Sequence, residues 1–177
     1  MSDLYQAAMI ETARRGSGRG RLAEPDTSAA VDNPLCGDRV IVDIRIEEIA
    51  PCDPPRDSFA RDSFAHDSFA DQRATRRLID LGHEVRGCLL CEAAAVILAE
   101  RAPGQAIESL LGLHRTIESA LRSGSEFPWP TLDIFSPVAA VKSRHRCITL
   151  PFEALHEALT MAMASADSPD SSLDSMR

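Results

Sequence analysis

Residues 39–49, Arg-Val-Ile-Val-Asp-Ile-Arg-Ile-Glu-Glu-Ile, decide the fold class because apolar and charged side chains alternate along them. One face of the stretch collects the apolar residues Val40, Val42, Ile44 and Ile46. The other face collects Asp43, Arg45 and Glu47. A period of two residues is typical of a half-buried strand, with one face on a core and the other in water. The stretch therefore predicts one strand of an antiparallel sheet.

The segments around this strand supply a helix and the rest of a small sheet. Residues 3–15 place apolar side chains at helical spacing and predict an amphipathic helix. Residues 14–32 are rich in Gly, Ser and Pro and predict an extended connection. Residues 76–86 predict two short extended pieces around a turn at Gly82, which would complete a three-stranded meander.

From Cys88 onward the pattern is helical. We expect helices at 88–101 and 105–122, an irregular crossover at 123–137, and a last helix covering the neighbourhood of Cys147 and then 152–164. A helix followed by a strand meander and several helices is the order of an α+β domain. The sequence therefore predicts a small three-stranded antiparallel sheet with helices stacked on one face.

The length of 177 residues suits one domain, which we place at 1–164. Residues 51–74 form a low-complexity insertion in which the tetrapeptide Asp-Ser-Phe-Ala recurs three times. We interpret the repeat as an expansion in a tolerant surface loop, with a tandem binding motif as the alternative. Residues 165–177 have the composition of a disordered tail.

The net charge and the shortness of the apolar runs argue against two classes of partner. A formal net charge of −8 argues against binding to nucleic acid through bulk positive potential. No apolar run approaches the roughly 20 residues that span a bilayer, so we expect no membrane partner. The N-terminus does not resemble a secretory signal, which predicts a soluble, cytoplasmic protein.

The chain has five cysteines. An odd number without an export signal weighs against a disulfide framework, so we consider reactive or metal-binding roles for them. Cys36 lies in a polar turn sequence at 33–38, where packing would not bury it. Cys88 opens a helix, and Cys147 enters the last one after the basic residues 144–146. The remaining two are Cys52, in a linker-like stretch, and Cys91, which is ambiguous.

Asp38 joins three of these cysteines in a candidate ligand set. Gly37 frees the backbone between Cys36 and Asp38, so the thiolate and the carboxylate could turn toward a common point. With Cys88 and Cys147 they make a four-ligand set suited to zinc or an iron–sulfur cluster. Spacing alone leaves open whether the four converge.

Three motifs resemble the iron–sulfur cluster assembly scaffolds of the NifU N-terminal, IscU and SufU family. They are Asn-Pro-x-Cys-Gly-Asp at 33–38, Gly-Cys at 87–88 before an Ala-rich helix, and Ser-Arg-x-x-Cys-x-x-Leu-Pro-Phe-x-Ala-Leu at 143–155. The resemblance implies a three-stranded sheet covered by helices, with the ligands gathered at one exposed end. The implied ligands are Cys36, Asp38, Cys88 and Cys147.

The resemblance also implies a function. A cysteine desulfurase would deliver sulfur to Cys147 or a neighbour, and a transient [2Fe–2S] cluster would form and pass to client proteins. The chain would thus be a non-enzymatic scaffold or sulfur carrier.

Two details are similar to the SufU branch: the long interval between Cys88 and Cys147, and Arg146 where IscU proteins have His. His145 is one position too early to match, and we expect it to be a solvated basic residue. The SufU resemblance gives an alternative, a zinc-dependent sulfurtransferase that uses the same ligands. A dithiol redox motif at Cys88 and Cys91 and a degenerate family member that binds nothing also stay open.

Overall fold

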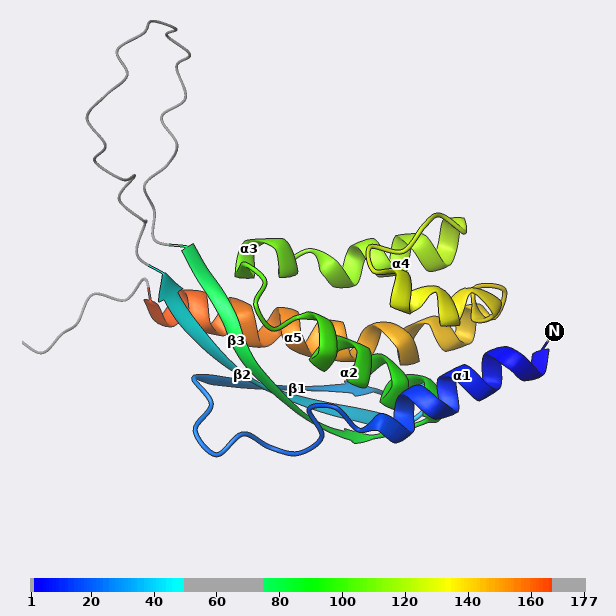
Figure 1. Ribbon diagram of the computed structural model, residues 1–177, viewed down its shortest axis with the longest axis horizontal. Helices are drawn as coiled ribbons and strands as arrows, with labels where there is room; N and C mark the ends of the chain where they lie inside the picture. The colour runs from blue at the N-terminus through cyan, green and yellow to red at the C-terminus, as the bar shows by residue number, and fades with distance from the viewer. Residues whose placement is uncertain (1, 50–74, 167–177) are drawn as a thin grey trace, which may run out of the picture.

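The computed structural model describes residues 2–49 and 75–166 of the chain (Figure 1). Cys52, the predicted insertion at 51–74 and the predicted tail from residue 167 onward lie outside the described residues. Ser165 and Ala166, which we assigned to the tail, are the last residues of a helix.

The sheet has three antiparallel strands in the order β1-β2-β3, which confirms the predicted meander. They are β1 (Thr27–Asn33), β2 (Asp38–Ile49) and β3 (Thr75–Arg86). The alternating stretch is the central strand, and its Val40, Val42 and Ile44 side chains are completely buried. The pattern of residues 39–49 therefore predicted both the strand and the face that packs on the core.

Two predictions about the sheet are wrong. Residues 27–33 are β1 rather than a connection, because pairing with β2 and packing under a helix compensate for their small, polar composition. Residues 75–86 form one continuous strand instead of two pieces around a turn. Gly82 is needed there for space, since a Cβ atom at this position would lie 2.7 Å from the carbonyl oxygen of Gly20.

Five α-helices are described. They are α1 (Ser2–Arg15), α2 (Leu89–Arg101), α3 (Ile107–Leu110), α4 (Leu113–Ser123) and α5 (His145–Ala166). The single helix expected at 105–122 is wrong, because the chain breaks at Gly112 into α3 and α4. The segment between α4 and α5, which includes the expected crossover at 123–137, contains two 3₁₀ helices, η1 (Pro130–Val138) and η2 (Lys142–Arg144). Both parts of the expected last helix belong to α5, which continues through Pro151.

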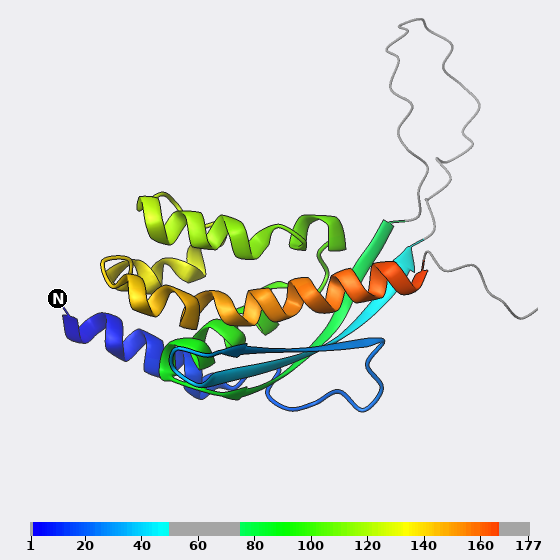
Figure 2. The same cartoon turned by 180° about the vertical axis from the view of Figure 1, so that it is seen from behind.

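The helices lie to one side of the sheet, as predicted (Figure 2). Helices α2 and α5 pack on the strands, α1 packs on α2, and α4 packs on α5. No helix within 2–49 and 75–166 combines the length and apolar character needed to cross a bilayer.

Residues 16–26 connect α1 to β1 and form a strap over the opposite face of the sheet. The N–H of Gly20 donates to the carbonyl of His83 at 2.8 Å, which covers part of the outer edge of β3. Asp43 points away from the helices, yet it is completely buried because the strap covers it. Its carboxylate accepts hydrogen bonds from Arg21 Nε at 2.6 Å, from the Leu22 N–H at 3.0 Å and from Ser28.

Candidate metal centre

The turn between β1 and β2 carries two of the predicted ligands. Cys36 is exposed in this turn, and Asp38 is the first residue of β2. Gly37 has a φ of 76°, a left-handed conformation that glycine adopts without steric cost, and its N–H donates to the Asn33 carbonyl. Because residues 27–33 form a strand that the sequence did not predict, the turn that contains Cys36 joins β1 to β2.

Helix α5 brings Cys147 to this turn. Cys147 lies in the first turn of α5, which packs along β1 and β2, and its side chain is completely buried. Ligand atoms of Cys36, Asp38 and Cys147 lie within 4.8 Å of one another. The two sulfur atoms are 3.8 Å apart. We call these three residues the thiol–carboxylate group.

Cys88 lies near the thiol–carboxylate group, at the start of α2, but farther away than the 4.8 Å that separates its three members. It is the N-cap residue of α2 in an extended conformation, and its thiol lies outside the 4.8 Å group. Gly87 packs closely against the Asp38 side chain, because a Cβ atom at position 87 would lie 3.0 Å from Cγ of Asp38 and would require that side chain to shift. Burial, followed by the neighbouring Cys88, Asp38 and Cys36, raises the pKa of the Cys147 thiol. The fourth predicted ligand therefore stands beside the other three.

The donor set fits a metal. Asp38 is only 5% exposed, and its Oδ2 atom is buried without a hydrogen-bond partner among the described residues. An orphaned carboxylate oxygen is costly in a protein interior and is a ligand that a cation would satisfy. Two thiolates bound at about 2.3 Å to one tetrahedral metal would have sulfur atoms roughly 3.8 Å apart. The observed sulfur–sulfur distance of 3.8 Å matches that geometry.

Cys91 lies behind the site. It is completely buried, and burial, then Asp38, Cys88, Cys147 and Cys36, raises its pKa. Buried thiols held in the protonated form are poor nucleophiles. Cys91 thus contributes packing at this end of the core.

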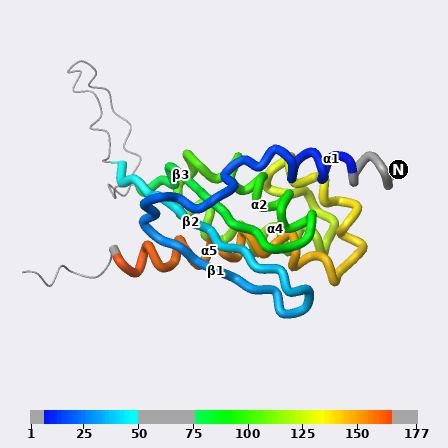
Figure 3. The backbone as a smooth tube through the Cα atoms, turned by 90° about the horizontal axis from the view of Figure 1, so that it is seen from below, coloured from blue at the N-terminus to red at the C-terminus, as the bar shows by residue number. Residues whose placement is uncertain are grey.

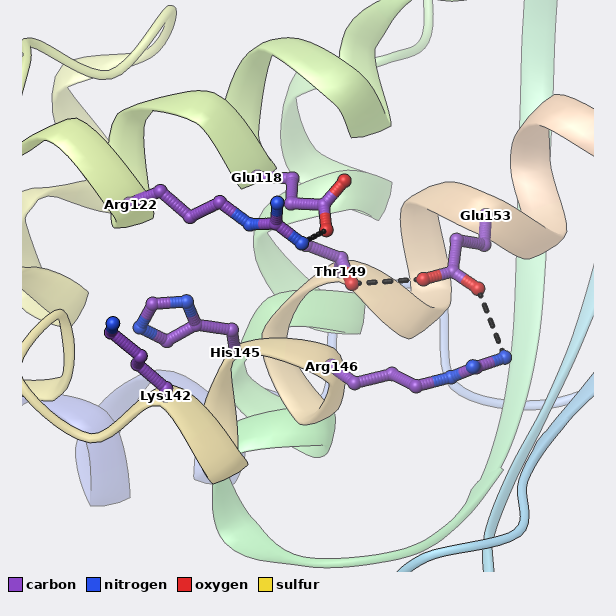
Figure 4. Close-up of a pocket in the computed structure, with 7 residues that line it drawn as sticks. All are labelled: Glu118, Arg122, Lys142, His145, Arg146, Thr149 and Glu153. Atoms are coloured by element: carbon purple, nitrogen blue, oxygen red, sulfur yellow. Dashed lines mark hydrogen bonds and ion pairs between the residues drawn. The ribbon is translucent and has the colours of Figure 1, made fainter.

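The expectation that His145 is solvated is wrong. Its side chain is buried, and its Nε2 atom lies 2.9 Å from the carbonyl oxygen of Ala139. It faces a polar pocket between α4, η2 and α5 (Figure 4). The sequence analysis missed this pocket, although the density of basic residues at 142–146 was a visible signal.

The sequence matches no protein-family model and no curated protein. Solved structures do match. The N-terminal part of a nitrogen-fixing NifU-like protein from Brucella abortus has a TM-score of 0.69 and 24% identity, with 92% of this chain and 96% of that chain covered. A hypothetical protein has a TM-score of 0.64 and 21% identity, with coverages of 90% and 99%.

A third match is a candidate iron–sulfur cluster assembly scaffold protein for the SUF system from the thermophile Fervidobacterium islandicum. Its TM-score is 0.63 at 17% identity, with 86% of this chain and 93% of that chain covered. Each of these structural similarities covers most of this chain and almost all of the matched chain. The chain therefore has the fold of the NifU-like and SUF scaffold structures, as its motifs predicted.

Proposed function

We propose that this chain is an iron–sulfur cluster assembly scaffold that binds a transient cluster through Cys36, Asp38, Cys88 and Cys147. The observation that best supports this function is the thiol–carboxylate group, in which two thiols and an unpartnered buried carboxylate oxygen lie within 4.8 Å. The shared fold with a NifU-like protein and with a SUF scaffold candidate agrees with it.

The mixture of thiolate and carboxylate ligands suits a cluster that is bound transiently and then released to a client. Thiolates bind soft metals and iron–sulfur clusters, whereas carboxylates prefer harder ions. Three cysteines would hold the cluster, and Asp38 would supply the weakest bond, from which release begins. The exposed position of Cys36 leaves the site open to a client on the side of the turn.

Sulfur would enter at Cys36. Our sequence analysis favoured Cys147 or a neighbour as the acceptor, but the Cys147 side chain is completely buried, whereas Cys36 is exposed. The Cys36 thiolate would attack the outer sulfur of a desulfurase persulfide. A Cys36 persulfide would form, and the desulfurase cysteine would leave as a thiolate. Cys147, at 3.8 Å, is placed to receive the sulfur next.

A zinc-dependent sulfurtransferase is the second candidate. The 3.8 Å separation of the two sulfur atoms favours it, because this distance suits a single tetrahedral ion. The same four residues would hold the zinc, which would keep their thiols deprotonated at neutral pH. The dithiol alternative loses support because Cys91 is buried and its pKa is raised.

Anaerobic reconstitution separates the two candidates. Protein loaded with zinc is incubated with iron and sulfide, and both metals are then measured. Replacement of zinc by iron and sulfide in the wild type, but not in Cys36→Ser, would support the scaffold. Retention of one tightly bound zinc would overturn the scaffold in favour of the sulfurtransferase.

Mass spectrometry after incubation with a desulfurase and cysteine tests the entry point of sulfur. We expect added sulfur on the peptide containing Cys36, and its loss in Cys36→Ser. Persulfide on Cys147 alone in that variant would contradict entry at Cys36.

A further inference from the structure

The basic run Lys-Ser-Arg-His-Arg at 142–146 stands out in a chain of net charge −8, and the metal centre does not use it. The chain folds this run against α4, and a pocket of about 540 Å³ opens between α4, η2 and α5 (Figure 4). Besides His145, the pocket is lined by Glu118, Arg122, Lys142, Arg146, Thr149 and Glu153.

Both carboxylates of the pocket already have partners. Glu118 accepts from Arg122 at 2.6 Å. Glu153 accepts from the Thr149 hydroxyl at 2.9 Å and faces Arg146 at 3.4 Å. Pairing therefore neutralises both acidic side chains and leaves the charge of Lys142 in excess.

The basic side chains keep unused donors. A guanidinium group has five N–H donors, and Arg122 uses one of them on Glu118. Among the residues that the structure describes, Lys142 forms no ion pair. Arg122 and Lys142 line the pocket from different elements, α4 and η2, and their charged ends lie on different sides of it (Figure 4).

A second hollow of about 320 Å³ continues the pocket along α4 and shares Glu118 and Arg122 with it. It adds Arg115 and the side chains of Ser119 and Ser123. The combined surface thus offers cations and hydroxyl groups over a length greater than one anionic group would need.

We propose that this pocket binds a small, multiply charged anion through phosphate or carboxylate groups, with Arg122 and Lys142 as its principal contacts. The planar fork of arginine matches both kinds of anionic group, and lysine adds a point charge. A divalent cation would meet three basic side chains, and an apolar ligand would desolvate ion pairs, so an anion is the occupant that the lining favours. The proposal does not depend on the chemistry of the metal centre.

Isothermal titration calorimetry of the full chain with pyrophosphate and, separately, with citrate tests the proposal. It also distinguishes a ligand bound through phosphate groups from one bound through carboxylate groups. We expect saturable binding of at least one probe that weakens as salt is raised. Arg122→Gln and Lys142→Gln should each weaken binding about tenfold. Glu118→Gln should strengthen it by about two- to fivefold, because it releases Arg122.

Arg45→Gln is the matched control, because Arg45 is an exposed cation on β2 and does not line the pocket. Its affinity should equal that of the wild type, and thermal unfolding should show that every variant is folded. Absence of saturable binding to either probe would overturn the proposal. An equal loss in Arg45→Gln and Arg122→Gln would also overturn it, since binding would then follow net charge alone.

Discussion

Asp38 sets the chemistry of the site at the scale of single residues. Its carboxylate is almost fully buried beside the Cys36 and Cys147 thiols, and Oδ2 has no partner among the described residues. A buried polar atom without a hydrogen bond typically costs about 1–3 kcal/mol. The metal-free protein therefore contains a destabilising group that a bound cation would satisfy.

Asp38→Ala should stabilise the metal-free protein by about 1 kcal/mol, because it removes the orphaned oxygen. It should also slow the loss of a reconstituted cluster to a chelator, since the weakest bond to the cargo is gone. Urea denaturation measures the first effect, and the decay of visible absorbance measures the second. Asp32→Ala, which removes an exposed partner of Arg39, is the control and should change neither. Faster cluster loss in Asp38→Ala would contradict the release role.

Motifs could single out the candidate ligands but could not predict their accessibility. The turn sequence at 33–38 and the Gly-Cys pair at 87–88 indicated which residues to follow. Whether a cysteine in the first turn of a helix is buried depends on what packs against that helix. Cys147 is covered because α5 lies on β1, a strand that the sequence analysis did not recognise.

At the scale of elements, the strap at 16–26 is held on the outer face of the sheet by a buried carboxylate. It attaches to the sheet through Asp43, which accepts hydrogen bonds from Arg21, Ser28 and Leu22. Burial alone would raise the pKa of Asp43, but these hydrogen bonds outweigh burial and hold the pKa below its usual value. The ionised form of Asp43 is thus the one that holds the strap on the sheet through these hydrogen bonds.

Asp43→Asn should lower the free energy of unfolding by about 2 kcal/mol at pH 7, because Arg21 loses a buried anionic partner. A carboxyl group whose pKa is lowered on folding stabilises the protein above its unfolded pKa of about 3.9. This contribution is lost as the pH falls through the lower pKa of the folded state. Urea denaturation from pH 7 to pH 3 should therefore show the difference between wild type and variant shrinking below about pH 4. A difference that stays constant over this range would contradict the assignment.

Gly82→Ala tests the contact between the strap and β3. The new Cβ atom would lie 2.7 Å from the Gly20 carbonyl oxygen, a backbone atom that moves only if the strap moves. We expect a destabilisation of about 2 kcal/mol, measured by thermal or urea unfolding. Gly112→Ala is the control, because nothing lies within 4 Å of a Cβ atom there and its φ of −96° suits alanine. Equal effects of the two substitutions would show that the strap does not press on β3.

Element type was predictable where the pattern was clear, through the periodicity of apolar residues in β2 and α1 and through the Ala- and Leu-rich composition of α2. The errors fell where tertiary contacts override local preference. Small residues at 27–33 form a strand because a partner strand pairs with them, and Gly82 marks a close backbone approach that looks like a turn in sequence.

At the scale of the whole molecule, the site is a product of long-range packing. The β1–β2 turn, the start of α2 and the first turn of α5 meet at one end of the sheet, and Figure 3 shows the corresponding strands and helices from below. No spacing rule in the sequence requires this meeting. The family resemblance predicted it, and the fold provides the physical reason, because α2 and α5 lie side by side on the sheet.

The most direct test of the central claim is iron and acid-labile sulfide analysis of the protein purified without oxygen, alone and after incubation with a desulfurase, cysteine and iron. We predict equal amounts of iron and sulfide after incubation, near one cluster per binding site, and loss of both in Cys36→Ser. Protein that gains no sulfide-containing iron under these conditions, and instead keeps stoichiometric zinc, would contradict the scaffold function.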